Sequence, residues 1–454
     1  MDSERFKVIL TAALIVSGAL LTASVGTGHT SSAEQSEGLA LDFGDMSVVW
    51  TELDLSLFTD PYEALEQVCY LNGFSLGVSE TGEVEEIDGC FSDPEGRSWH
   101  LWLINSGSTV WNLAEGPVGT DLSEYTLAAW AYCSSSETPS VGTDQSGRSI
   151  YGHGKPYRSV TLSPSVTEVV SSVGAVETIV GTDRYSDYPS SVVEGQQSGR
   201  ISIVGDFTTP NYEAIVKTRP DVVLCDGSQY NHIQMADRLR VVGIDSVLMY
   251  SGESIDTIVD NIFIAGTVMG MAEDALQTIR SLEGAMEEIA EVLDGSPFTK
   301  YVRTMVSLSP DMSPWVSGSY TYVDDIMSDV YGVNIFSNYD GWVHLNSEQI
   351  MDRNPSVIII LTYDYPATQE SYDAMIAGLS NEWKATDAYK NGEIYLVSED
   401  AGEMSQRPGP RFAQVAELVA RILNPDIFGD ITMSKFIGSD YRDYLTYTKE
   451  LGFQ

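Results

Sequence analysis

The sequence predicts an α/β protein of two similar lobes, joined by one long helix and preceded by a small β-rich module. Three observations indicate this. Short apolar runs alternate with helical patterns from about 157 to 428, and one sequence pattern occurs twice within that region. Between the two copies, an amphipathic stretch from Ala272 to Leu293 interrupts the alternation. Strands interleaved with helices are typical of α/β architecture.

The length and charge of the chain set outer limits on what it is. Its 454 residues exceed what one hydrophobic core usually organises, so two or three domains are expected. The chain has 24 Lys and Arg against 66 Asp and Glu, a formal net charge of −42. This charge repels phosphates and excludes an electrostatic nucleic-acid-binding protein. It indicates a strongly solvated surface suited to salty or extracellular surroundings, with an acidic face for a basic partner as the alternative.

The first residues have the pattern of a targeting segment. An apolar run from Val8 to Ala23 follows Arg5 and Lys7 and is short for a membrane span. We interpret 1–28 as a secretory signal peptide or an uncleaved N-terminal anchor. The protein is therefore expected outside the cytoplasm, at the outer face of the cytoplasmic membrane.

Four cysteines are too few for a disulfide scaffold. In an oxidising exterior at most one pair could form among Cys69, Cys90 and Cys133, and the sequence leaves the pairing open. Cys225 ends the apolar run DVVLC, where a buried and inert thiol is expected.

A segment rich in Ser, Thr and Gly divides the chain. Its sequence, SSSETPSVGTDQSG, has the composition of a flexible linker, which we place at 134–156. It separates a small module at 45–133 from a large module at 157–428.

Within the large module, strands and helices are expected in turn. The run YRSVTL precedes the helical pattern SVTEVVSSVG, in which Ser165 and Glu168 fit a capping box and Gly174 a helix stop. Buried parallel strands are expected at ETIVGT, DVVLC, DSVLMY, PSVIIIL and GEIYLV. We place lobe 1 at 157–252 and lobe 2 at 298–428.

The stretch between the lobes has apolar residues at helical spacing. It predicts a helix over 272–294, about 33 Å long, which would bridge the lobes. The apolar positions are Leu276, Ile279, Leu282, Met286, Ile289 and Leu293.

The repeated pattern is N-x-E-x-I-x-x-x-x-P-x-V. It occurs as NYEAIVKTRPDVVL, with Glu213, and as NSEQIMDRNPSVII, with Glu348. In each copy Asn is a plausible N-cap, Glu lies in the first turn where the helix dipole favours a carboxylate, and the last apolar run is a central strand. A single such Glu is usually just a helix-start residue, but repetition on two matched lobes favours a two-point docking surface.

These segments resemble the substrate-binding proteins of ABC importers for cobalamin and iron chelates. The resemblance lies in RSVTLSPSVTEVVSSVGAVETIVGTDRYSDYP, VGDFTTPNYEAIVKTRPDVVL, WVHLNSEQIMDRNPSVIIIL and KNGEIYLVSEDAGEMSQRPGPR, in that order. It implies two Rossmann-like lobes joined by one helix, the class III binding-protein fold, with ligand held between the lobes. It also implies that Glu213 and Glu348 pair with arginines of a dimeric membrane permease.

The candidate ligand residues follow strand ends, where α/β proteins usually hold their ligands. Five aromatic residues in Gly-, Asp- and Ser-rich segments are candidates to cover a large flat ligand. Arg407 resembles a family arginine that reaches the polar edge of the ligand. Glu403 precedes it by four residues, where the cobalamin binders of the family carry an acidic residue, so the resemblance makes Glu403 a ligand candidate too. Arg411 is the alternative to Arg407. The aromatic candidates are Tyr185, Tyr188, Phe207, Tyr230 and Trp342.

The small module resembles the C-terminal, cobalamin-contacting domain of transcobalamin-type carriers. The likeness lies in a helix within DPYEALEQVCYLNGFSL, a strand within SWHLWLIN and a closing strand YTLAAW. It implies an α+β, β-rich domain and favours a corrinoid ligand. Its tryptophans could form an exposed apolar surface for binding, but residues of the sheet core are the simpler interpretation.

The sequence disfavours three other functions. An enzyme is disfavoured because no nucleophile elbow, phosphate loop or H-E-x-x-H motif occurs. A receptor for bare metal ions needs several converging ligands, and only His232 and His344 fall in possible cleft loops, so no metal site is assigned. Solvent-facing or structural roles are expected for these two histidines, with contact to the metal of a bound chelate as the alternative. An adhesive or structural surface protein has no need for paired glutamates.

The sequence therefore predicts an extracytoplasmic binding protein of an ABC importer. Its expected ligand is a corrinoid such as cobalamin, with a ferric siderophore or haem as the alternative, and no covalently bound cofactor is expected.

Overall fold

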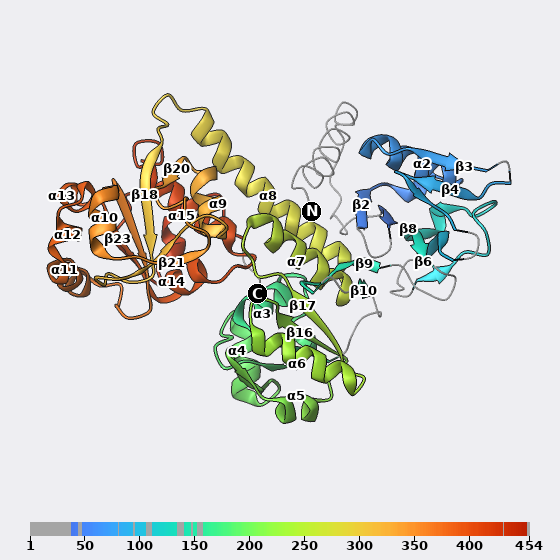
Figure 1. Ribbon diagram of the computed structural model, residues 1–454, viewed down its shortest axis with the longest axis horizontal. Helices are drawn as coiled ribbons and strands as arrows, with labels where there is room; N and C mark the ends of the chain where they lie inside the picture. Colours follow the sequence, from blue (N-terminus) through green and yellow to red (C-terminus); the bar gives the residue numbers. More distant parts are fainter. Residues whose placement is uncertain are drawn as a thin grey trace, which may run out of the picture.

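The computed structural model describes residues 38–43, 48–79, 81–93, 96–105, 111–133, 140–146, 149–151, 158–429 and 431–451. The expected leader or anchor at 1–28 lies outside the described residues, as does part of the linker. Figure 1 shows lobe 2 on the left, lobe 1 below the centre and the small module on the right, with the long helix α8 running from lobe 2 to the centre above lobe 1. No helix within these described ranges is both long enough and apolar enough to cross a membrane.

The small module is built on a five-stranded sheet of order β2-β1-β8-β6-β7, with a helix and a three-stranded sheet beside it. Trp99 and Trp130 are at most 5% exposed within its main core, and Trp102 is buried in a smaller cluster. These tryptophans are therefore core residues. The elements are β1 Gly38–Asp42, β2 Val48–Glu52, α2 Pro61–Asn72, β3 Leu76–Val78, β4 Val84–Ile87, β5 Cys90–Phe91, β6 Ser98–Asn105, β7 Asn112–Leu113 and β8 Tyr125–Cys133.

Strand β1 precedes the module boundary expected at residue 45. It lies inside the sheet, antiparallel to β2 and parallel to β8. All five of its residues are buried, so the sheet depends on it. The four cysteines are free in the structure, and Cys225 is fully buried as expected.

The described part of the linker is a hairpin that binds lobe 1. Strands β9 (Ser140–Thr143) and β10 (Ser149–Tyr151) pair antiparallel. Between them, the Asp144 carboxylate accepts a hydrogen bond from Arg240 Nη2 at 2.9 Å, and the Gln145 N–H donates to the Leu248 carbonyl at 2.8 Å. The Asp144 side chain is only 2% exposed. The segment has the composition of a flexible linker, but its described part is an ordered attachment to lobe 1.

Lobe 1 is a parallel sheet of order β13-β12-β11-β16-β17 with helices packed around it. Its strands are short, and all but the exposed edge strand β13 are almost wholly buried, as the apolar runs predict. A small hairpin, β14 with β15, precedes α5. The elements are β11 Ser159–Thr161, α3 Pro164–Ser172, β12 Ile179–Thr182, α4 Ser190–Ser198, β13 Ser202–Ile203, β14 Gly205–Asp206, β15 Thr209–Pro210, α5 Tyr212–Thr218, β16 Val222–Asp226, α6 Tyr230–Val241, β17 Asp245–Met249 and α7 Ile255–Val268.

Helix α8, Ala272–Asp294, is the long helix expected between the lobes. It buries Ile279, Leu282, Ile289 and Leu293, four of the predicted apolar positions; the side chain of Leu276 lies outside the described part. Its apolar residues belong to one hydrophobic cluster that continues from α3 and α7 in lobe 1 to α9 and α15 in lobe 2. The two lobes therefore share a core along this helix.

Lobe 2 is a mixed sheet of order β21-β19-β18-β22-β23-β24, with β20 also paired to β18. Most of it is parallel, and β19 and β21 form its antiparallel edge. The elements are β18 Val302–Ser307, β19 Trp315–Ser317, α9 Tyr322–Asp329, β20 Gly332–Asn334, β21 Trp342–His344, α10 Ser347–Arg353, β22 Val357–Leu361, α11 Gln369–Gly378, α12 Asn381–Lys384, α13 Asp387–Asn391, β23 Ile394–Val397, α14 Glu399–Gln406, α15 Phe412–Leu423 and β24 Phe436–Ile437.

Lobe 2 also continues past the boundary expected at residue 428. Strand β24 joins its sheet beside β23. The buried Glu417 carboxylate on α15 accepts backbone hydrogen bonds from Tyr447 at 3.1 Å and Thr448 at 2.9 Å. The segment 431–451 is therefore part of this lobe.

The two lobes repeat one structural unit. The order β12-β11-β16-β17 in lobe 1 matches β20-β18-β22-β23 in lobe 2, and every pairing in both sets is parallel. Helices α5 and α10 each begin at an Asn N-cap whose side chain accepts from a backbone N–H at 3.0 Å. Each ends at a left-handed residue, Arg219 or Asn354. The repeated sequence pattern thus encodes the same helix and following strand twice.

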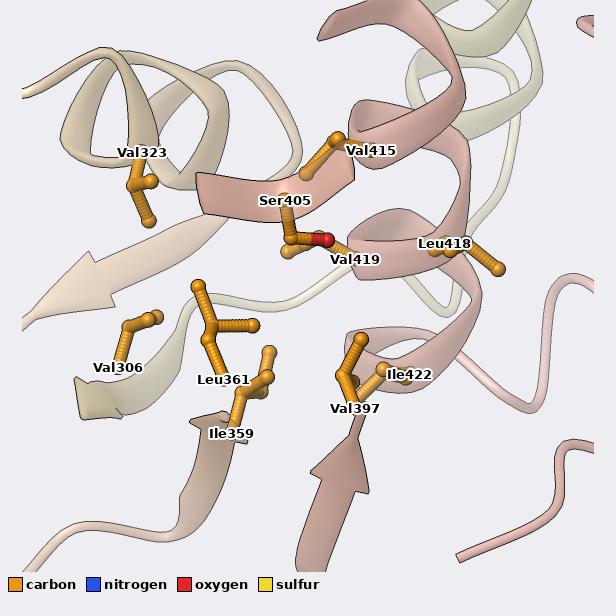
Figure 2. Close-up of a pocket in the computed structure, with 10 residues that line it drawn as sticks. All are labelled: Val306, Val323, Ile359, Leu361, Val397, Ser405, Val415, Leu418, Val419 and Ile422. Atoms are coloured by element: carbon orange, nitrogen blue, oxygen red, sulfur yellow. The ribbon is translucent and has the colours of Figure 1, made fainter. Parts of the chain in front are cut away.

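An interior void of about 10 Å³ lies in lobe 2 between its sheet and α15. Figure 2 shows its lining residues, which are aliphatic except for Ser405. This volume is about that of one water molecule. The void is a packing defect of the core and too small for a solute.

The hairpin attachment can be tested by replacing Asp144. The variant Asp144→Ala is expected to lower the free energy of unfolding by about 1–3 kcal/mol, because Arg240 loses its buried acceptor. Denaturant unfolding measures this loss. The matched control Asp237→Ala removes the exposed partner of the same arginine, 3.4 Å away, and should cost less than about 0.5 kcal/mol. Equal losses in both variants would contradict the attachment.

Candidate functional site

A charged network joins the two lobes where they meet. Arg407, at the C-terminal end of α14 in lobe 2, donates from Nη1 to Asp187 Oδ1 of lobe 1 at 2.5 Å. The same nitrogen lies 3.4 Å from Glu168 Oε1, also in lobe 1. Its Nη2 donates to Glu403 of lobe 2 at 3.1 Å. We call Glu168, Asp187, Glu403, Arg407 and Arg411 the seam cluster.

The innermost pair of the seam cluster is Glu168 with Arg411. Arg411 donates from Nε to Oε2 at 2.8 Å and from Nη2 to Oε1 at 2.6 Å. The two side chains are 1% and 4% exposed. Burial alone would lower the pKa of Arg411, but the Glu168 carboxylate outweighs it and raises that pKa. Arg411 therefore stays charged, and its two hydrogen bonds to Glu168 tie α3 of lobe 1 to the start of α15.

The local role expected for Glu168 is wrong. The N-cap of α3 is Ser163, whose hydroxyl accepts from the Val166 N–H at 3.3 Å, so Ser165 and Glu168 form no capping box. Glu168 instead points into the seam. Its partner lies 243 positions away along the chain, and no local pattern marks such a contact.

The pKa values of Glu403 and Asp187 are shifted in opposite directions. Burial raises the pKa of Glu403 to about 7; the Arg407 charge opposes this shift, and the Asp187 and Asp400 charges reinforce it. Burial also acts to raise the pKa of Asp187, but the hydrogen bond and charge of Arg407 outweigh it and lower that pKa. Near neutral pH Asp187 is thus ionised, while Glu403 is partly protonated.

Two of the predicted aromatic residues flank the seam cluster. The guanidinium of Arg411 lies over the Tyr188 ring, 4.2 Å from its centroid, and Arg442 donates to the Tyr188 hydroxyl at 3.2 Å. Tyr185 is 54% exposed, and its carbonyl accepts from Arg407 Nη2 at 3.4 Å. Lobe 1 thus presents Tyr185 beside Arg407 and Tyr188 beside Arg411 of lobe 2.

The other predicted aromatic residues lie on both lobes. Phe207 is the tip of the β14–β15 hairpin, and Trp342 begins β21 and is half-buried against the main core. Each precedes its lobe's repeated Glu by six positions, so the two have the same place in the repeated sequence pattern, although they lie in different elements. Tyr230 begins α6 and is 69% exposed. These residues stay candidates for ligand contact.

Tyr363 is a candidate that the sequence analysis missed. It follows the end of β22, and 58% of its surface is exposed. Burial of its hydroxyl raises its pKa, and the charges of Arg407 and Glu403 also act on it. The rule that found Tyr185 after β12, a polar or aromatic residue just past a parallel strand, applies equally to Tyr363.

The two candidate histidines differ in their surroundings. His232 is fully buried, and its neutral ring has both nitrogens engaged: Nε2 donates to the Phe207 carbonyl at 2.7 Å, and Nδ1 accepts from the Asp226 N–H at 3.0 Å. Burial lowers its pKa. His344 is exposed with its ring centroid 5.3 Å from that of Trp315. The described residues contain no group of His, Cys, Asp or Glu arranged to hold a metal ion.

Glu213 and Glu348 occupy equivalent places on the surface. Each lies in the first turn of its helix, α5 or α10, and both are exposed. In Figure 1, α5 lies at the lower edge of lobe 1 and α10 near the outer edge of lobe 2. Each lobe thus offers one carboxylate at the same position of the repeated unit.

Two lobes of matching strand order, tied by one long helix and meeting at a charged seam, define a class III solute-binding protein. The chain belongs to the periplasmic binding protein family, whose model matches residues 160–401, more than half of the sequence. It is therefore a solute-binding component of the ABC-importer type that works with a membrane permease. The family consists of binding proteins and not enzymes.

Three relatives show the breadth of the likeness. The chain is 24% identical over 286 residues to an uncharacterized ABC transporter substrate-binding lipoprotein of Bacillus subtilis, over 63% of this chain and 85% of that protein. It is 25% identical over 293 residues to a cobalamin-binding protein of Halobacterium salinarum, over 63% and 73% of the two chains. A periplasmic heme-binding protein from Pseudomonas aeruginosa shares the fold, with a TM-score of 0.51, 15% identity and coverage of 60% and 93%.

The buried pair in the seam can be tested by Glu168→Gln. This variant is expected to lower the free energy of unfolding by about 3–5 kcal/mol, because Arg411 stays charged and buried without its counterion. Chemical denaturation measures the loss. The control Glu177→Gln breaks an exposed pair with Arg200 at 3.7 Å and should change stability by less than about 0.5 kcal/mol. A loss in Glu168→Gln no larger than the control's would show that the pair does not hold the lobes.

Proposed function

We propose that this protein captures a corrinoid outside the cytoplasmic membrane and delivers it to the permease of an ABC importer. The observation that carries this proposal is the seam, where lobe 1 places Tyr185 beside Arg407 and Tyr188 beneath Arg411 of lobe 2. Rigid aromatic rings and a few fixed polar groups suit a large, mostly apolar cofactor with a polar edge. The cobalamin-binding relative from Halobacterium salinarum supports the same choice.

The shared core along α8 sets how the site works. Because one hydrophobic cluster runs through α8 into both lobes, opening about a hinge would expose apolar surface. Capture therefore uses two lobes that are already formed, with small adjustments at the seam. The small module, which resembles a cobalamin-contacting domain, would approach the ligand from the side of lobe 1, where its linker is attached.

Visible absorbance and calorimetry test the ligand. Cyanocobalamin titrated into the purified protein is expected to bind with a dissociation constant of about 1 μM or below. The alternative ligands are haem and a ferric siderophore, measured in the same way. Tight binding of either alternative without binding of cyanocobalamin would replace the corrinoid assignment.

We further propose that Glu213 and Glu348 dock the protein on the permease dimer by pairing with arginines, one per lobe. Exposed ion pairs contribute about 0–1 kcal/mol each, so they would set the position of the complex more than its strength. Like charges in contact cost several kcal/mol, so charge reversal is a sharper test than neutralisation.

The double variant Glu213→Arg with Glu348→Arg should bind ligand as the parent does but reduce uptake by about tenfold or more. Uptake is measured in cells that carry the cognate importer. The control Glu194→Arg reverses an exposed charge on α4 and should leave uptake unchanged. Normal uptake in the double variant would rule out docking through these residues.

A further inference from the structure

The arginines at the seam are already neutralised by the protein's own carboxylates. Arg407 contacts Asp187, Glu168 and Glu403, and Arg411 is held by both oxygens of Glu168. Above the pKa of Glu403, three carboxylates thus face two guanidinium groups. The seam cluster has a surplus of negative charge.

The surrounding charges do not remove this surplus. Asp183, 1% exposed at the end of β12, lies close enough for the Arg407 charge to act on its pKa, and Asp400 acts on Glu403 in the same way. Arg442 adds one cation beside Tyr188. With these groups included, carboxylates still outnumber arginines.

The hydrogen-bonding capacity of the seam is equally one-sided. Arg407 directs both terminal nitrogens at protein oxygens, those of Asp187, Glu168, Glu403 and the Tyr185 carbonyl. Asp187 and Glu403 also share a side-chain hydrogen bond with each other. A carboxylate oxygen can accept more than one hydrogen bond, so acceptors remain while the terminal donors of Arg407 are engaged. The side chains of Asp187 and Glu403 are 44% and 31% exposed, which leaves them within reach of a solute. The seam therefore offers acceptors to N–H and O–H donors.

A ligand with peripheral carboxylates would bind this seam weakly. Its anionic groups would have to displace Asp187 or Glu403 from Arg407 and leave a partly buried carboxylate without a partner. A ligand with peripheral amides can donate N–H groups to the same oxygens without breaking the pairs. Between two ligands with the same ring, the charge of the peripheral groups would therefore decide which one binds more tightly.

We propose that Asp187 and Glu403 are specificity-determining residues that select an amide-bearing corrinoid and reject chelates with peripheral carboxylates. This inference rests on the proposed function and deepens it. It gives Asp187 and Glu403 a role in selecting the ligand, whereas Glu168 holds Arg411 and contacts Arg407. It also names the ligand chemistry, a flat metal-bearing ring with amide donors at its edge.

The test compares two corrinoids with the same ring. Cyanocobalamin carries peripheral amides and a nucleotide loop, whereas cobyrinic acid carries carboxylates in place of the amides and has no loop. The loop differs equally for every protein variant, so a change in the ratio between variants reports on the peripheral groups. Calorimetry at about pH 8 and about 0.15 M salt, where distant charges are screened, gives the ratio of their dissociation constants. The unmodified protein should prefer cyanocobalamin by at least about tenfold, and Asp187→Asn and Glu403→Gln should each narrow that ratio by at least about threefold. The control Glu194→Gln makes the same change in net charge away from the seam and should leave the ratio unchanged.

A second measurement needs no substitution. Lowering the pH from about 8 to about 6 protonates Glu403, whose pKa is about 7, and removes one negative charge from the seam. In the unmodified protein, the ratio of the dissociation constants of cobyrinic acid and cyanocobalamin should fall between pH 8 and pH 6. In Glu403→Gln the same ratio should change less over this range. The charged and titratable groups around Glu403 are Asp187, Arg407, Asp400 and Tyr363.

The outcomes separate the two proposals. If cyanocobalamin binds but the two seam variants leave the ratio as it was, the selective role is overturned and the corrinoid function stands. If cobyrinic acid binds as tightly as cyanocobalamin, the selective role is likewise overturned. If neither corrinoid binds at micromolar concentration, the proposed function itself fails and the inference fails with it.

Discussion

The relation between the lobes depends on the buried ion pair of Glu168 with Arg411. Two hydrogen bonds of 2.8 and 2.6 Å join α3 of lobe 1 to the start of α15 in lobe 2. A buried pair adds little net stability, but either member alone would be costly, so the pair specifies one arrangement of the lobes. The same Glu168 carboxylate contacts Arg407 and thereby helps place that arginine at the seam.

The hydrophobic cluster along α8 acts together with this pair. The helix buries one face against both lobes, so the lobes cannot separate without exposing apolar side chains. The seam cluster is therefore held from two sides, by apolar packing behind it and by the buried pair within it. A rigid frame of this kind keeps Tyr185, Tyr188 and Arg407 in place before a ligand arrives, which reduces the entropy lost on binding.

The small module is less independent than its linker composition indicates. The segment that reads as flexible carries Asp144, whose carboxylate reaches Arg240 and whose neighbour Gln145 bonds to the backbone of β17. Composition describes the average behaviour of Ser, Thr and Gly in an isolated chain. One buried charge pair is enough to override it, because the partner is supplied by another domain.

The sequence alone determined the features that arise from local chemistry: the two capped helices with Glu213 and Glu348, the buried strands after them, and the long helix at 272–294. Caps, apolar spacing and strand runs act over a few residues, so they can be read along the chain. Only the tertiary structure decided the seam. There Arg407 contacts Asp187, 220 positions away in the sequence, and Glu168 is the buried counterion of Arg411 instead of a member of a capping box. Such contacts depend on how two lobes pack, and no spacing within one segment records that.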